Sequence, residues 1–357
     1  MEIPSGVPIN RGELDMKNYR RAAKIKVFEL GLLSSLGFLS TLFWLSGTCV
    51  GAAREELIEG AKKEGEVVFY ASMDIEQANA LTAKFEERYP FLKVRLNRAG
   101  SEKLLTKVLT EARAKKYLVD AIQTVGFSMR TLGKQGILGY YLSPENRFYP
   151  KEFKEEGYWI TARYNPYVVA TNTKLVQRGS LPKNYEDLLN PQWRGKMMME
   201  ETKVDWFAGV LQIMGKERGL KYMRDLAKQD IMPRVGHNLI SQLVATGEAQ
   251  LAINIAAPAV EALTKKGAPI DWIALGPVPA IMIGIGMASK APHPNAAKLF
   301  LDFVLSQEGQ KQLQQHYPWL ARAGFTQERA IKVVPVDPAL AENINEYAKL
   351  MRDIFSK

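Results

Sequence analysis

Short apolar runs alternate with segments of helical spacing over most of this sequence. Residues 66–72 (EVVFYAS) are β-branched and aromatic and predict a strand, whereas residues 74–90 predict an amphipathic helix. Residues 92–100 predict a second strand, 101–116 a second helix and 119–125 a third strand. Strands and helices that alternate in this way form βαβ units with a parallel sheet. The chain is therefore expected to have an α/β fold.

A second series of such elements follows in the later part of the chain. We expect strands over 231–235, 250–255 and 270–274, and helices over 238–246 and 259–266. A single core stops growing at about 250–300 residues. A chain of 357 residues with two such series therefore predicts two lobes.

The first fifty residues have the composition of an export signal. Five basic residues between positions 17 and 26 precede an apolar run, and small residues follow it. We expect residues 1–52 to be a signal peptide that is cleaved after Ala52 and directs the protein to the periplasm. Alternatives are a lipid anchor at Cys49, an uncleaved membrane anchor over 27–45 on a sensory or scaffold module, and a start at Met16.

The charge balance argues against one class of partner. The net charge is +10, but the lysines and arginines are scattered among acidic residues. No block of basic residues resembles a nucleic-acid-binding arm, so we expect no nucleic-acid partner. A basic surface of this kind helps to draw small anions towards a cleft.

Side chains suited to catalysis are scarce. The histidines His237, His293 and His316 have no partner at zinc-ligand spacing, and the sequence holds neither a G-x-S-x-G motif nor a phosphate-binding loop. The only cysteine is Cys49, which lies within the predicted signal. We expect a protein that is not an enzyme and has no metal or other cofactor. An exported enzyme acting on a small anion is the alternative from a different class.

Ligands of open α/β sheets bind beyond the carboxyl ends of the strands, where helices begin. Ser72, Ser101 and Thr124 lie at such places in the predicted first lobe. Each serine is equally well placed to cap the helix that follows. Capping and ligand contact therefore both stay open for Ser72 and Ser101.

Four segments in the same order resemble a known family. They are residues 89–124, 171–199 (TNTKLVQRGSLPKNYEDLLNPQWRGKMMM), 239–253 and 291–314. The sequence resembles bacterial extracellular solute-binding proteins of the ferric-iron type, the receptors of ABC importers, over about residues 66–317. The resemblance implies a monomeric receptor that takes a small-molecule ligand and delivers it to ABC permease subunits.

The resemblance also implies a type II periplasmic-binding-protein fold, with two α/β lobes joined by crossing strands and a ligand clamped between them by hinge closure. The first lobe would be discontinuous and contain residues 53–163 and 283–357. The second lobe would contain residues 172–279, and residues 164–171 and 280–282 would form the hinge.

One position departs from the ferric members of this family. They hold iron with two adjacent tyrosines near a strand-to-helix turn that aligns with residues 255–259, where this chain has Ala256, Ala257 and Pro258. Phenolate oxygens bind Fe(III), and alanine and proline do not. The pair Tyr140 and Tyr141 lies in the first lobe, where packing explains it. We expect an anion or organic acid as ligand, with ferric iron or a ferric–anion complex as the alternative.

Ten residues at strand ends, helix starts or lobe crossings are the candidate ligand contacts: Ser72, Ser101, Thr124, Arg163, Tyr164, Thr202, Trp206, Asn238, Asn254 and Ala257. Arg163 can hold a carboxylate or phosphonate bidentately, or form an ion pair with Glu155 or Glu156. Trp206 is suited to a cleft wall or to the core. Asn238 is placed to cap a helix, with ligand contact as the other role.

Overall fold

The computed structural model describes residues 53–325 and 329–356, so the predicted signal peptide lies outside the described residues. The described residues from position 54 onward form one compact unit. A helix over 53–64 leads into the predicted alternation. The elements are β1 (Glu66–Ala71), α2 (Ile75–Arg88), β2 (Lys93–Arg98), α3 (Ser101–Arg113), β3 (Ala121–Val125) and α4 (Gly126–Lys134). The strand and helix predictions for this part of the chain are confirmed.

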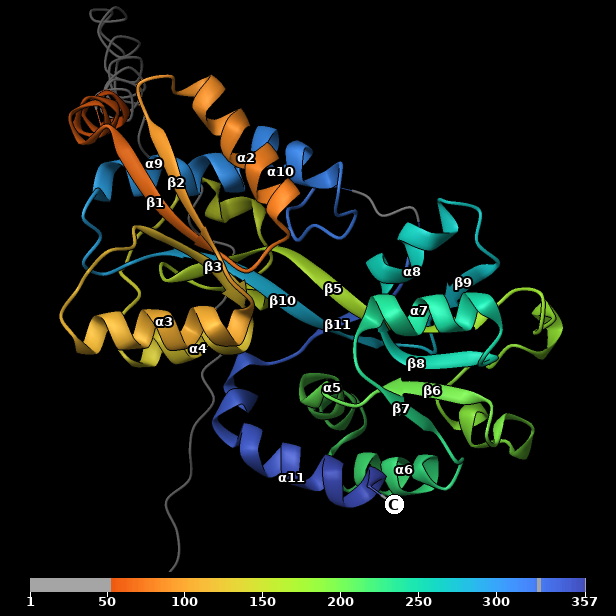
Figure 1. Ribbon diagram of the computed structural model, residues 1–357. Helices are drawn as coiled ribbons and strands as arrows, with labels where there is room; N and C mark the ends of the chain where they lie inside the picture. The colour runs from red at the N-terminus through yellow and green to blue at the C-terminus, as the bar shows by residue number, and fades with distance from the viewer. Residues whose placement is uncertain (1–52, 326–328, 357) are drawn as a thin grey trace, which may run out of the picture. The chain divides into compact units, whose positions relative to one another are not determined.

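Two long strands hold the sheet together. β5 (Trp159–Asn172) pairs through its first part with β10 (Val278–Met287), which pairs with β3. The second part of β5 pairs with β8 (Leu251–Ala256) and with β9 (Ile270–Ile273). The strand order is β2-β1-β3-β10-β5-β8-β6-β7, which runs through the centre of Figure 1. We call β1–β3 the first half-sheet, and β6 (Met197–Glu200), β7 (Met232–Arg234) and β8 the second half-sheet.

Helices cover both faces of the first half-sheet. Helices α2, α9 (Pro294–Leu305) and α10 (Gln307–Gln314) lie on one face, and α3 and α4 lie on the other (Figure 1). Phe69 of β1 packs on Phe300 of α9 with ring centroids 4.7 Å apart, while its neighbour Tyr70 belongs to the cluster under α3 and α4. Alternate residues of β1 therefore supply two separate apolar layers.

The second half-sheet is covered by α5 (Val204–Met214) and α6 (Lys216–Ala227) on one face, and by α7 (His237–Thr246) and α8 (Ala257–Thr264) on the other. The predicted strand over 250–255 and helix over 259–266 leave a turn over residues 256–258. In the described structure β8 ends at Ala256 and α8 starts at Ala257, so no turn separates them. The helix starts two residues earlier than predicted because Pro258 fits the first turn of a helix.

The C-terminal segment contacts a different part of the molecule than the sequence suggested. After β11 (Val333–Pro335) and the 3₁₀ helix η6 (Pro338–Asn343), helix α11 (Ile344–Phe355) packs on α5 and α6. Met351 and the apolar side chains around it join the core of the second half-sheet. The sequence predicts residues 283–357 in the first lobe, and for α11 the contacts with α5 and α6 differ from that prediction. An amphipathic helix buries its apolar face wherever a complementary surface is available, and its own sequence does not specify that surface.

The remaining elements are short: η1 (Pro144–Phe148), η2 (Lys151–Phe153), β4 (Lys154–Glu155), η3 (Arg178–Ser180), η4 (Glu186–Leu189) and η5 (Pro191–Trp193). No helix within the described ranges is long and apolar enough to cross a membrane.

Candidate functional site

The register of the sheet places the carboxyl ends of the two half-sheets opposite each other. Val125, the last residue of β3, pairs with Ile283, which also pairs with Arg163 of β5. Ala256, the last residue of β8, pairs with Tyr167 of β5. Four residues of a strand span about 13 Å. The two sets of strand ends, where α/β proteins bind ligands, therefore face each other across residues 163–167.

Arg163 is the only charged side chain in that stretch of β5, and it is 5 % exposed. Its Nη1 donates to Asn165 Oδ1 at 3.2 Å, and its guanidinium lies 3.6 Å from the ring centroid of Tyr317. Its Nε is buried and has no hydrogen-bond partner among the described residues. Burial lowers the pKa of Arg163, but a guanidinium remains charged at neutral pH.

The ion-pair alternative for Arg163 is wrong. Glu155 accepts hydrogen bonds from Arg130 and Trp159, and Glu156 accepts one from Asn146. Within the described part of the chain, no carboxylate lies within 4.0 Å of the Arg163 guanidinium. Asp74 is connected to Arg163 through Tyr317, whose hydroxyl donates to the Asp74 carboxylate at 3.2 Å. A buried cation that lacks a carboxylate is suited to receive one from a ligand.

A second buried ionic group lies at the end of β6. Glu200 is fully buried, and its carboxylate accepts from the Thr202 amide at 3.1 Å and from the Thr202 hydroxyl at 2.8 Å. Lys203 pairs with it at 3.2 Å. These contacts and the positive charge of Lys203 lower the pKa of Glu200 against the opposing effect of burial. The Glu200 carboxylate therefore occupies the hydrogen-bond donors of Thr202 and Lys203, which precede α5 and would otherwise be available to a bound anion.

Sequence reasoning missed Glu200. The available signal was a carboxylate directly after the apolar run KMMM at the end of a strand. Thr202, a predicted ligand contact, instead gives its hydroxyl to Glu200.

Asn254 ties β8 to β6. Its side-chain oxygen accepts from the Glu200 amide at 2.9 Å, and its side-chain amide donates to the Glu200 carbonyl at 2.8 Å. Its φ is 54°, a left-handed conformation that asparagine adopts more readily than most residues. The side chain predicted to contact ligand thus holds the two strand ends together.

His237 begins α7 beside the same strand end. The Ala256 amide donates to its Nδ1 at 3.4 Å, so the neutral ring carries its proton on Nε2. Burial, with the positive charge of Lys203, lowers the pKa of His237 to about 4. His237 is therefore a neutral donor at neutral pH. Its ring lies 6.0 Å from that of Tyr167, whose hydroxyl donates to Asp205 at 2.6 Å.

The predicted capping roles are wrong at three positions. The residues that precede α2, α3 and α7 are Asp74, Gly100 and Gly236, rather than Ser72, Ser101 and Asn238. Each helix therefore begins one or two residues away from the start that was predicted from its polar residue.

The other candidates lie in several places. Ser72 donates its amide to Gln123, and Thr124 is buried with no partner for its hydroxyl in the described ranges. Tyr164 packs on Phe153 and Trp319, and Trp206 belongs to the core of the second half-sheet. Ala257 is buried as the first residue of α8. The structure thus brings Thr202 and Asn254 together around Glu200, close to His237. Ser101 begins α3 beside the first half-sheet, whereas Trp206 packs in the core of the second.

The tyrosine pair outside the candidate site is only partly explained by packing. Tyr141 donates to Asp302 and is partly buried, as expected of a packed side chain. Tyr140 is 63 % exposed, and its ring packs edge-on against that of Tyr158 with centroids 5.7 Å apart.

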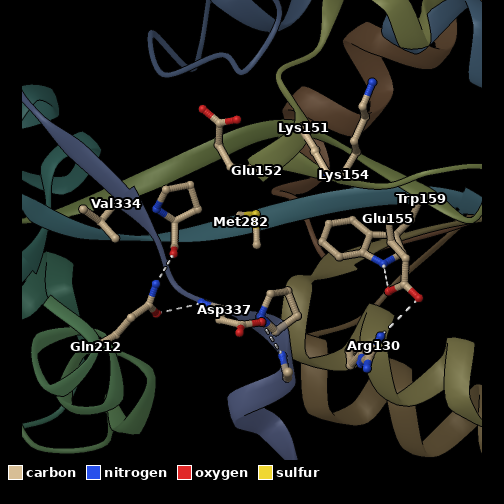
Figure 2. Close-up of a pocket in the computed structure, with 13 residues that line it drawn as sticks. Arg130, Lys151, Glu152, Lys154, Glu155, Trp159, Gln212, Met282, Val334 and Asp337 are labelled. Atoms are coloured by element: carbon tan, nitrogen blue, oxygen red, sulfur yellow. Dashed lines mark hydrogen bonds and ion pairs between the residues drawn. The ribbon is translucent and has the colours of Figure 1, made fainter. Parts of the chain in front are cut away.

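A cavity of about 590 Å³ lies on the face of β10 opposite to the side chain of Arg163 (Figure 2). Met282 lines it, whereas the next residue, Ile283, pairs with Arg163, and neighbouring strand residues point to opposite faces. Gln212 lines this cavity, donating to the Pro335 carbonyl at 3.1 Å and accepting from the Asp337 amide at 3.0 Å. This face therefore holds the contact between α5 and the C-terminal segment.

Two half-sheets whose carboxyl ends face each other, joined by β5 and β10, define a two-lobed type II periplasmic-binding-protein fold. The chain belongs to the bacterial extracellular solute-binding protein family, whose model matches residues 120–352. The sequence has no match among curated proteins.

Solved structures show the same fold. Iron-bound HitA from Pseudomonas aeruginosa is 22% identical with a TM-score of 0.70, covering 81% of this chain and 99% of its own. The Trichodesmium protein IdiA (FutA), in complex with iron and citrate, is 19% identical with a TM-score of 0.72, covering 82% and 100%. AfuA from Actinobacillus pleuropneumoniae, with fructose-6-phosphate bound, is 21% identical with a TM-score of 0.65, covering 81% and 97%.

Proposed function

We propose that this protein is the receptor of an ABC import system and captures a small anion or organic acid between the facing strand ends. It would be exported by the signal peptide predicted over 1–52, act as a monomer and hand its ligand to permease subunits without chemical change. Membership of a solute-binding family supports this class of function. The observation that carries the choice of an anion is Arg163, a buried cation without a carboxylate partner in the described chain.

The physical argument concerns the cost of burial. A buried charge is stable only when other groups compensate it, and Arg163 has a neutral side-chain acceptor and an aromatic ring. A carboxylate or phosphonate would add charge-assisted hydrogen bonds to its free donors. The neutral His237, which donates through Nε2, would add a further hydrogen bond from the second half-sheet.

The ferric alternative depends on the residues at the start of α8. Ala256, Ala257 and Pro258 offer no side-chain oxygen to a hard cation. The Trichodesmium structure with iron and citrate supports an alternative in which iron enters as a complex with an organic acid. Such a complex needs fewer ligands from the protein, and the acid would take the place proposed here for the ligand.

Thermal-shift screening against ferric salts, phosphonates, sulfonates, dicarboxylates and polyamines tests the proposal. A ligand at 100 times its Kd stabilises the folded state by about 2.7 kcal/mol. We expect an anion to give the largest shift, and Arg163→Met to abolish it. Arg130→Met, on the other face of the crossing strands, is the matched control and should keep the shift. If ferric salts alone gave the largest shift, the choice of an anion would be wrong.

A further inference from the structure

A second cavity, of about 470 Å³, lies on the outer side of the first half-sheet, and Arg163 is not part of its lining. It is formed where α2 ends, where η1 begins and where α9 passes into α10. Four arginines line it: Arg54, Arg88, Arg147 and Arg322. The family resemblance assigns no role to these residues.

Arg322 is the buried member of this arginine pocket. It is 8 % exposed, and its Nη2 pairs with Glu145 Oε2 at 3.0 Å. Its Nη1 is buried, and no residue that the structure describes forms a hydrogen bond with it. The guanidinium lies 4.1 Å from the ring centroid of Phe148, and that of Arg147 lies 4.8 Å from the same ring. Phe148 thus holds two guanidinium groups at the wall of one cavity.

The other arginines have spare donors. Arg54, Arg88 and Arg147 are exposed, and none has a carboxylate within 4.0 Å among the residues described by the structure. Arg54 donates to the hydroxyl of Tyr89 at 3.3 Å, a neutral partner.

The carboxylates of the lining neutralise only part of this charge. Glu145 is engaged by Arg322, and Asp302 accepts from Tyr141 and Ser143 at 2.9 and 2.6 Å. Burial raises the pKa of Asp302. Glu308 is the third acid of the lining, so the arginines outnumber the carboxylates. The cavity therefore has an excess of positive charge with unpaired donors.

We propose that the arginine pocket binds a phosphate group. A phosphate offers several oxygens to planar guanidinium forks at once, which a single carboxylate cannot do for three or four arginines. The phosphate can come from a soluble phosphate ester or from the headgroup of an anionic lipid. The lipid source is relevant because Arg54 follows the predicted cleavage site by two positions. If the chain were anchored to the membrane through its N-terminal segment, the anchor would lie only a few residues before Arg54.

Calorimetry tests the pocket on the purified chain carrying Arg163→Met, which silences the site between the half-sheets. The soluble probe is glycerol 3-phosphate. We expect binding that weakens at least tenfold in Arg88→Gln/Arg147→Gln. The matched control is Arg113→Gln/Arg352→Gln, which removes two exposed arginines elsewhere and should bind as before.

Cosedimentation with phosphatidylglycerol vesicles, and with phosphatidylcholine vesicles as the neutral control, identifies the source of the phosphate. Capture by phosphatidylglycerol alone that is lost in the Arg88/Arg147 variant assigns the lipid headgroup, and calorimetric binding without vesicle capture assigns a soluble ester. The proposal is overturned if neither probe binds, or if both bind the Arg88/Arg147 variant as tightly as its parent. Neither outcome affects the proposed import function, which depends on Arg163.

Discussion

The guanidinium of Arg163 lies over the ring of Tyr317, 3.6 Å from its centroid, and the Tyr317 hydroxyl donates to Asp74 at 3.2 Å. This relationship joins the middle of β5, the segment after α10 and the loop before α2. A neutral ring replaces the carboxylate that a buried arginine normally has. The charge of Arg163 therefore stays available to a ligand while its position is held.

Substitutions of Tyr317 separate the ring contact from the hydroxyl contact. Tyr317→Phe removes only the hydrogen bond to Asp74 and should cost about 1 kcal/mol of unfolding free energy. Tyr317→Leu also removes the cation–π contact and should cost about 1–2 kcal/mol more, because Arg163 is desolvated. Urea unfolding measures both values. Equal losses in the two variants would mean that the ring contributes nothing.

A glycine–alanine pair at Asn254 tests the backbone conformation at the end of β8. Both variants lose the two hydrogen bonds to Glu200, at a cost of about 2–4 kcal/mol. Alanine must also hold a φ of 54°, which costs it about 1 kcal/mol more than glycine. We expect Asn254→Ala to be the less stable in thermal unfolding. The opposite order would show that the strand end relaxes out of the left-handed conformation.

Acid should destabilise the protein through His237. Its folded-state pKa is lowered to about 4, so the unfolded chain takes up the proton first as the pH falls below about 6.5. Stability is therefore lost between pH 6.5 and 4, by an amount on the order of 3 kcal/mol. Unfolding free energies measured from pH 7 to pH 4 should show a shallower decline in His237→Gln. Parallel curves for the two proteins would contradict this origin of the acid sensitivity.

Gly209 of α5 lies against the C-terminal segment. An added Cβ would lie 2.6 Å from the Cβ of Pro279 and 2.8 Å from a methyl group of Val336. Gly209→Ala should therefore destabilise the protein by about 1–3 kcal/mol through overpacking. Gly133 of α4 is the matched control, since its nearest neighbour would lie at 3.9 Å. Gly133→Ala should leave stability unchanged or raise it by roughly 0.5 kcal/mol, as helix propensity favours alanine. A loss at Gly133 as large as at Gly209 would exclude the overpacking explanation.

The sequence alone determined the α/β alternation. The strands and helices from Glu66 to Arg113, and those from Met232 to Ile273, follow from apolar periodicity, which each segment carries within itself. Their ends were less well predicted, since Asp74, Gly100 and Gly236 precede helices where serine or asparagine was expected. The four segments that resemble solute-binding proteins likewise indicate the family without reference to any tertiary contact.

Tertiary structure decided what surrounds each charge. The pairing of Asn254 with Glu200, the ring of Tyr317 over Arg163 and the packing of α11 on α5 all join residues far apart in the sequence. Glu155, proposed as a partner of Arg163 from its nearness in sequence, pairs with Arg130 of α4 instead. A periodic pattern specifies which face of a segment is buried, but the partner of a buried polar group is set by whichever segment the fold brings against it.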